Sequence, residues 1–186
     1  MTLANKVTIT RILLIPVYVA CAVAYARSLQ HGLANEWWRW TAVAVFTVAA
    51  STDGLDGYLA RKLKQDSRLG RLLDPLADKG LLLTGIFTLT WVPWQWSFPI
   101  WFPLLVCLRD VLCIAAAFLI DHVAGHVEVR PHWTGKWATV FQMCAMGWVM
   151  LNIPFLNPII PTYIAGIFTF VSGMVYLREG IRQLRV

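Results

Sequence analysis

The chain has 186 residues, of which 58% are hydrophobic and 14% are charged, and its formal net charge is +6. A chain of this length fits a single domain, expected to span residues 1–186. Its apolar composition excludes an ordinary soluble domain and predicts an all-α, polytopic membrane protein. The positive charge is therefore better explained by membrane topology than by a nucleic-acid partner, and none is expected.

Six apolar segments, each a candidate transmembrane helix, follow a short amphipathic lead at residues 1–10. They are residues 12–26, 38–60, 72–92, 98–120, 137–151 and 159–177. Several are shorter than the span of about 20 residues that a bilayer requires, so their ends are approximate. Lys6 and Arg11, an apolar run and Ala24–Ala26 also imitate a secretory signal peptide, but we interpret this region as a retained first span.

Lysine and arginine are distributed unevenly between alternate polar segments. The odd-numbered segments hold Lys6, Arg11, Arg61, Lys62, Lys64, Arg68, Arg71, Arg130, Lys136, Arg178, Arg182 and Arg185. The even-numbered segments hold only Arg27, with Arg39 just inside the next helix. The positive-inside rule then places both chain ends and residues 53–78 on the cytoplasmic side, in what we expect to be a bacterial cytoplasmic membrane.

Tryptophans gather at the opposite ends of the apolar segments. They are Trp37, Trp38, Trp40, Trp94, Trp96 and Trp101. Tryptophan is enriched where a membrane meets water, so these residues are expected to form an interfacial belt. Simple packing in the protein core is the alternative.

Four acidic residues between positions 53 and 78 suggest the chemistry. Asp53 and Asp56 are three residues apart and Asp74 and Asp78 are four apart, so on a helix each pair shares one face. Two such helices facing each other would bring together four carboxylates, which cannot all stay ionised without a cation. Hard oxygen ligands suit Mg²⁺ or Mn²⁺. Solvated helix-end charges are the alternative, but acids inside apolar runs are costly and typical of functional sites.

The same stretch resembles the signature of the CDP-alcohol phosphotransferases. That signature is D-x-x-D-G-x-x-A-R, eight further residues, and then G-x-x-x-D-x-x-x-D. Its fixed positions are all present, as Asp53, Asp56, Gly57, Ala60, Arg61, Gly70, Asp74 and Asp78. Asn5, Thr8 and Arg11 also resemble the usual opening of this family. The resemblance implies a membrane enzyme with a CDP-linked lipid as donor and CMP as leaving group, and also a homodimer.

The motif predicts roles for its residues. Two Mg²⁺ or Mn²⁺ ions are expected, because a pair of metals can stabilise both the attacking and the leaving oxygen. Their expected ligands are Asp53, Asp56, Asp74 and Asp78, and the resemblance implies that Asp78 is also the general base. The expected CDP-binding residues are Asp53, Asp56, Gly57, Ala60, Arg61 and Gly70. Gly57 and Gly70 allow close approach of a nucleotide, and Arg61 can pair with its diphosphate.

The second half of the chain bears on the acceptor. Arg109 and Asp110 interrupt an apolar run, and Arg130 and Lys136 precede the fifth segment. These four residues are the expected acceptor-binding set. The alternatives are a purely structural ion pair for Arg109 and Asp110, and positive-inside anchors for Arg130 and Lys136.

Two alanines favour an acceptor of low charge. Ala117 and Ala138 occupy positions that are basic in family members that use glycerol 3-phosphate, a dianion. The run from Ser172 through Gly173 to Tyr176 also looks like that of the cardiolipin synthases of this family. We therefore expect a phosphatidyltransferase that uses CDP-diacylglycerol and phosphatidylglycerol to make cardiolipin. Phosphatidylglycerophosphate synthesis from glycerol 3-phosphate is the alternative.

Two other classes of protein compete with an enzyme. A transporter also carries charged residues inside the membrane, but it has no need for glycines and an Ala-Arg pair at fixed offsets between paired acids. A membrane scaffold needs none of these residues. Release of CMP from CDP-diacylglycerol would separate an enzyme from both.

Overall fold

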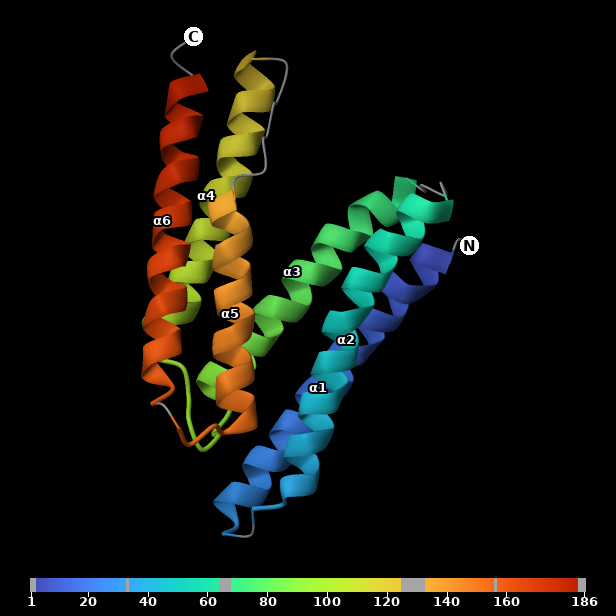
Figure 1. Cartoon of the computed structure of the whole chain (residues 1–186), viewed down its shortest axis with the longest axis vertical. Helices are drawn as coiled ribbons and strands as arrows, with labels where there is room; N and C mark the ends of the chain where they lie inside the picture. The colour runs from blue at the N-terminus through green and yellow to red at the C-terminus, as the bar shows by residue number, and fades with distance from the viewer. Residues whose placement is uncertain (1–2, 33, 64–67, 125–132, 156, 184–186) are drawn as a thin grey trace. The chain divides into compact units, whose positions relative to one another are not determined.

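The computed structural model describes residues 3–32, 34–63, 68–124, 133–155 and 157–183, with the backbone alone for residues 3–7, 53–63, 68–76, 117–124 and 183. Within these ranges every regular element is a helix, which confirms the all-α class. The helices are α1 (Leu3–Gln30), α2 (Glu36–Leu63), α3 (Arg68–Trp91), α4 (Trp101–Ala124), α5 (Trp133–Leu151) and α6 (Ile159–Gln183) (Figure 1). Each overlaps one of the six apolar segments expected from the sequence.

The expected N-terminal lead is not a separate element. α1 begins at Leu3 and continues without interruption through the first apolar segment to Gln30. The expected lead is thus helical and continuous with the first span, since no glycine or proline between Leu3 and Thr10 breaks the helix. Its amphipathic character stays a prediction. After the end of α1, Gly32 has a φ of 75°, a left-handed conformation that glycine adopts readily at a helix C-terminus.

The chain divides into two compact units, residues 1–97 and 98–186. In the first unit α1 packs against both α2 and α3, which also touch each other. In the second unit α6 packs against both α4 and α5. α1 and α6 are therefore the central helices of their units, since each packs against both other helices of its unit. The single domain expected for residues 1–186 stays a prediction.

One face of α1 supplies much of the core of the first unit. Its buried residues recur at helical spacing, as Thr8, Arg11, Tyr18, Ala22 and Tyr25. α2 contributes Ala42, Phe46 and Ala49 to this core, and the Tyr18 and Phe46 rings lie 5.3 Å apart between centroids. Small residues let the helix backbones approach closely. At its N-terminal end the buried face of α1 becomes polar, with Thr8 and Arg11.

The second unit has a partly polar interior and an apolar exterior. Thr162, Thr169 and Ser172 of α6 are all buried. By contrast, one face of α4 is exposed at Leu104, Leu108, Val111 and Ile114. Such an arrangement suits a lipid surrounding, where the helix exterior must be apolar and small polar residues join helices inside.

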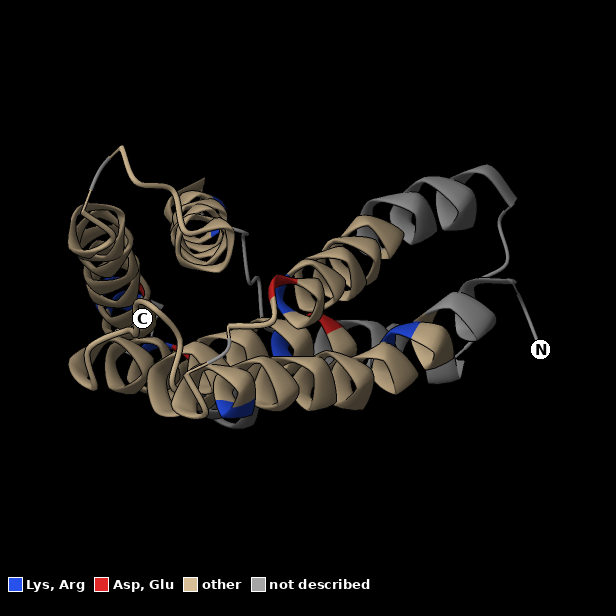
Figure 2. Cartoon of the chain, turned by 90° about the horizontal axis from the view of Figure 1, so that it is seen from below, with Lys and Arg blue, Asp and Glu red and all other residues tan. Residues whose placement is uncertain are grey.

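Two helices among the described residues are long and apolar enough to cross a membrane, Thr8–Gln30 in α1 and Ile159–Arg182 in α6. These two helices fit a membrane protein, and few Lys, Arg, Asp or Glu residues lie on the parts of the helices that Figure 2 colours by charge. α2 and α3 carry the charges of the acidic motif, which lower their hydropathy. The expected topology of six spans therefore stays a prediction.

The tryptophans divide between the two interpretations considered for them. Trp37, Trp40 and Trp96 are exposed, as an interfacial belt requires. Trp94 is only 7% exposed, and its ring meets that of Tyr25 edge-on at 4.9 Å. Core packing is therefore the correct interpretation for Trp94.

Candidate active site

The acidic motif occupies the C-terminal half of α2 and the N-terminal half of α3. α2 carries Asp53, Asp56, Gly57, Ala60 and Arg61, and α3 carries Gly70, Asp74 and Asp78. Both pairs of aspartates thus lie on helices, as their spacing predicted, and these two helices are in contact. Of the eight motif side chains, that of Asp78 belongs to the part whose side chains are described.

Asp78 forms an ion pair with Arg11, near the N-terminus of the first unit. Its Oδ1 accepts a short hydrogen bond from Nη1 of Arg11, on α1. The Arg11 side chain is 1% exposed, whereas that of Asp78 is 39% exposed. Solvent or a ligand can therefore reach Asp78 while a buried guanidinium holds one of its oxygens.

Arg11 also contacts α2, directly beside the other half of the motif. Its Nε donates a long hydrogen bond of 3.5 Å to Oγ1 of Thr52, the residue before Asp53. The Thr52 hydroxyl itself donates to the carbonyl oxygen of Ala49 over 2.7 Å. Because the single hydroxyl proton is used in that bond, the oxygen is oriented to accept from Arg11. One side chain of α1 thereby touches residues of both α2 and α3.

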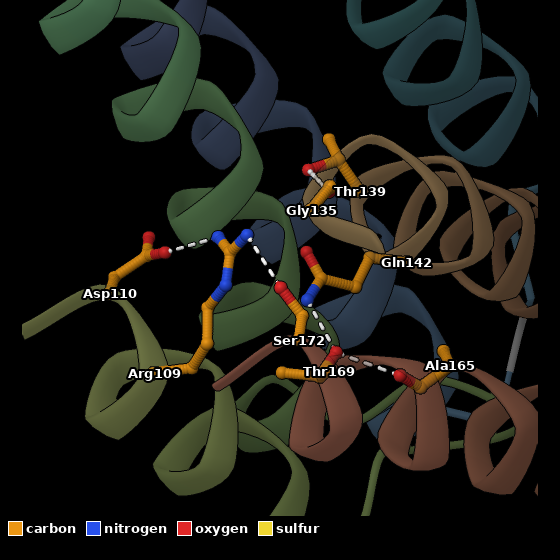
Figure 3. A network of polar contacts seen from close by, with 8 residues as sticks. All are labelled: Arg109, Asp110, Gly135, Thr139, Gln142, Ala165, Thr169 and Ser172. Atoms are coloured by element: carbon orange, nitrogen blue, oxygen red, sulfur yellow. Dashed lines mark hydrogen bonds and ion pairs between the residues drawn. The ribbon is translucent and has the colours of Figure 1, made fainter. Parts of the chain in front are cut away.

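In the second unit, Arg109 of α4 is held by several neighbours (Figure 3). Its Nη1 donates to Oδ1 of Asp110 over 2.8 Å, and its Nη2 donates to Oγ of Ser172 over 3.1 Å. The guanidinium lies over the ring of Tyr176 at 5.5 Å. Both Ser172 and Tyr176 belong to α6, so this cluster joins α4 to the central helix of the unit.

Arg109 keeps donors beyond those two bonds. A guanidinium carries five N–H groups, and Nε of Arg109 is buried without a hydrogen-bond partner among the described residues. An unpaired buried N–H is unfavourable, so this donor needs an explanation. The expected structural ion pair with Asp110 is present, but it uses only part of the guanidinium.

The remaining acceptor residues are placed differently from Arg109. Lys136 is exposed near the start of α5, with its Nζ 5.9 Å from the Trp133 ring centroid. Arg130 lies outside the described residues. A separate buried bond from Nε2 of Gln142 to Oγ1 of Thr169, 2.7 Å long, links α5 to α6. Thr169 in turn donates to the carbonyl oxygen of Ala165, so this link is satisfied and structural (Figure 3).

No group of three or more His, Cys, Asp or Glu side chains gathers among the residues whose side chains are described. Three of the four expected metal ligands, Asp53, Asp56 and Asp74, lie outside that part of the chain. The carboxylate donor set suits Mg²⁺ or Mn²⁺ in its chemistry. The metal site therefore stays a prediction.

Comparison with known proteins identifies the family. The family model described as CDP-alcohol phosphatidyltransferase matches residues 1–175. The chain belongs to this family. As a phosphatidyltransferase it is an enzyme, so the transporter and scaffold classes considered from the sequence are excluded.

Curated relatives of this phosphatidyltransferase share one activity name, CDP-diacylglycerol--glycerol-3-phosphate 3-phosphatidyltransferase. The relative from Haemophilus influenzae is 33% identical over 175 residues, covering 92% of this chain and 89% of its own length. The relative from Pseudomonas fluorescens is 31% identical and covers 100% of this chain and 93% of its own length. A relative from Shigella flexneri is 29% identical, covering 91% and 90%.

These names overturn the expected acceptor. The prediction of a cardiolipin synthase that uses phosphatidylglycerol was wrong, because the relatives are named for glycerol 3-phosphate. It rested on two missing cations, at Ala117 and Ala138. In the structure Ala138 is fully buried, where it packs in the core of the second unit, and Arg109 and Lys136 remain as cations. The two missing basic residues were therefore a weaker guide to the acceptor than the basic residues that are present.

The sequence did not reveal which residues hold Asp78 and Arg109 of the phosphatidyltransferase in place. Arg11 was counted among the cations of the polar segments, yet it is buried against Asp78. Its helical spacing from Thr8 and Tyr18, both on the buried face of α1, could have shown this. Ser172 and Tyr176 were noted only as part of a resemblance, and no sequence signal joined them to Arg109.

Proposed function

We propose that the protein transfers the phosphatidyl group of CDP-diacylglycerol to a hydroxyl of glycerol 3-phosphate, forming phosphatidylglycerophosphate and CMP. The observation that carries this proposal is the shared activity name of relatives that align along nearly the whole chain, at 33% identity over 92% of it in one case. The alignment extends far beyond the acidic motif, so the similarity includes the second unit.

The first unit would perform the transfer. Asp78 accepts the proton of the attacking hydroxyl of glycerol 3-phosphate. The hydroxyl oxygen then forms a bond to the phosphatidyl phosphorus, and the bond between that phosphorus and the CMP oxygen breaks. Asp53, Asp56, Asp74 and Asp78 are the residues that would hold two Mg²⁺ or Mn²⁺ ions, which when bound neutralise charge on the diphosphate. Gly57, Ala60, Arg61 and Gly70 complete the proposed CDP-binding set. The Asp78 side chain is 39% exposed, so the attacking hydroxyl can reach it.

The phosphate of the acceptor needs cations, and Arg109, Arg130 and Lys136 are the residues proposed to bind it. Arg109 has a buried N–H without a protein partner, and a guanidinium binds phosphate oxygens strongly through charge-assisted hydrogen bonds. Lys136 is exposed and can add a second positive charge, and Arg130 is proposed as a third. Asp110 would orient Arg109 and would not contact the dianion, which it repels.

The cellular location is proposed on similar grounds. The relatives described above come from bacteria. Together with the uneven distribution of Lys and Arg, this supports an enzyme of the bacterial cytoplasmic membrane that acts at the cytoplasmic face. The homodimer implied by the family resemblance stays a prediction.

A lipid product assay tests the proposed function. Purified protein in detergent micelles is given CDP-diacylglycerol and Mg²⁺ with either glycerol 3-phosphate or phosphatidylglycerol. We expect phosphatidylglycerophosphate and an equal amount of CMP from the first mixture and no CMP above background from the second. If glycerol 3-phosphate gives no lipid product under conditions where CMP is released with another acceptor, the proposed function is wrong.

A further inference from the structure

Arg11 is the most deeply buried cation among the described side chains, and the reaction proposed above gives it no role. Its side chain is 1% exposed, on the face of α1 that packs against α2 and α3. Burying a guanidinium is unfavourable unless the charge is paired and its N–H groups are hydrogen bonded. A hydrophobic residue would fill the same core position without this penalty. The position therefore demands an explanation in terms of what Arg11 contacts.

Two described contacts of Arg11 lie at Asp78 of the acidic motif and at Thr52, next to the first aspartate of the motif. Its ion pair is with Asp78, 67 residues away on α3, and its hydrogen bond is with Thr52, 41 residues away on α2. Thr52 directly precedes Asp53, the first aspartate of the motif. The planar guanidinium has donors on different edges, so it can bond to both helices at once, which an ammonium group cannot do with the same geometry.

We propose that Arg11 is a positioning residue for phosphatidyl transfer, which fixes the Asp78 carboxylate and sets the spacing of α2 and α3 at the motif. This rests on the proposed role of Asp78 as general base, though not on the identity of the acceptor. The guanidinium holds Oδ1 of Asp78 from the buried side. The carboxylate is thereby kept in one orientation while 39% of the side chain stays accessible.

The consequence of losing Arg11 should appear in the rate of reaction. Misplacing a reacting group by about 1 Å can lower a rate by roughly 100-fold, even when substrates still bind. The substitution leaves every residue assigned to the acceptor unchanged, so the KM values should change little. Because Asp78 is partly exposed, water can solvate it in the absence of Arg11, and the fold should survive the substitution.

The test compares three Arg11-centred variants with a matched control. Arg11→Met removes the charge at similar length, Arg11→Lys keeps the charge without the planar fork, and Thr52→Val removes the second contact. Arg27→Met is the control, since Arg27 is an exposed arginine in the last turn of the same helix. Each purified protein is assayed for CMP release over a range of both substrates, and its thermal unfolding midpoint is measured.

We expect kcat to fall about 100-fold in Arg11→Met, with both KM values within about threefold of wild type. The kcat of Arg11→Lys should be about tenfold higher than that of Arg11→Met, and the kcat of Thr52→Val should be about threefold lower than that of wild type. Arg27→Met should match wild type. A kcat of Arg11→Met within threefold of wild type would overturn the inference. So would a loss that lysine does not reduce and that follows a lower unfolding midpoint, since that is the behaviour of a purely structural ion pair.

The same assay separates this inference from the proposed function. Wild-type protein is measured first with glycerol 3-phosphate. If it releases CMP only with a different acceptor, the proposed acceptor is wrong, and the Arg11 variants are compared with that acceptor. The outcome for Arg11 is then decided by the ratio of kcat values, which does not depend on the acceptor chosen.

Discussion

Gly135 of α5 lies directly against the guanidinium of Arg109 of α4. A Cβ atom at position 135 would lie 2.9 Å from Nη2 of Arg109 and 2.9 Å from the hydroxyl oxygen of Tyr176. Real Cβ contacts of that length essentially do not occur, so the close approach depends on the missing side chain. The glycine thereby allows Arg109, Tyr176 and Ser172 to pack as one cluster.

The first prediction is that Gly135→Ala impairs use of the acceptor more than it impairs folding. The new methyl group must displace the tips of Arg109 and Tyr176, which are the far ends of flexible side chains. A displaced Arg109 loses a charge-assisted hydrogen bond to phosphate, which raises the KM for glycerol 3-phosphate by roughly tenfold or more. Steady-state kinetics with each substrate varied in turn would check this.

Gly147→Ala is the control for that variant. Gly147 also lies in α5, but a Cβ atom there would meet nothing within 4 Å. Alanine at this position should leave both KM values unchanged, because it adds a methyl group in open space. Equal effects of the two substitutions would show that the contact between Gly135 and Arg109 has no part in acceptor binding.

The second prediction concerns the hydroxyl that holds Arg109. Ser172→Ala removes the acceptor of the 3.1 Å bond from Nη2. We expect the KM for glycerol 3-phosphate to rise about threefold to tenfold, from a lost hydrogen bond worth about 1 kcal/mol, with the KM for CDP-diacylglycerol unchanged. Thr162→Val is matched to it, since it removes another buried hydroxyl of α6 that bonds only to the Pro158 carbonyl oxygen in the described structure. A rise in both KM values, or in neither, would contradict the prediction.

The third prediction is a strict requirement for a divalent cation. Activity should disappear in excess chelator and return on addition of Mg²⁺ or Mn²⁺, because four carboxylates suit such ions. Asp74→Asn should lower turnover by at least about 100-fold without lowering the unfolding midpoint, since it removes a charge repelled by its neighbours. Glu36→Gln, at the start of α2, is the control and should remain active. Full activity of wild type in chelator would reject the metal mechanism.

The helices could be predicted from the sequence because apolar segments bounded by polar ones are a strong signal. Their ends could not, since polar flanking residues also adopt helical conformation. α1 extends back to Leu3 and α6 continues to Gln183, well beyond the apolar segments. The placement of Arg11 shows the same difficulty. A charge near the end of a helix resembles a loop cation until the tertiary partner, Asp78, is known.

The chemistry of the candidate site could be predicted from the sequence, but its acceptor could not. Paired aspartates at helical spacing indicated the chemistry, since such spacing is rare by chance inside apolar runs. The acceptor could not be deduced from Ala117 and Ala138, because a phosphate site depends on the cations that are present and on how they are held. The bond from Arg109 to Ser172 joins residues 63 positions apart in sequence, and no local pattern encodes such a contact.

The last prediction concerns topology. The distribution of basic residues places the segment between α2 and α3 in the cytoplasm and the segment between α1 and α2 outside. In a variant whose four cysteines are replaced by alanine, a cysteine at Ser67 should resist a membrane-impermeant thiol reagent added to intact cells. A cysteine at His31, an exposed residue just after α1, should react readily. Permeabilising the membrane should make Ser67→Cys reactive and leave His31→Cys unchanged. Labelling of Ser67→Cys but not His31→Cys in intact cells would invert the orientation and place the acidic motif on the outer side.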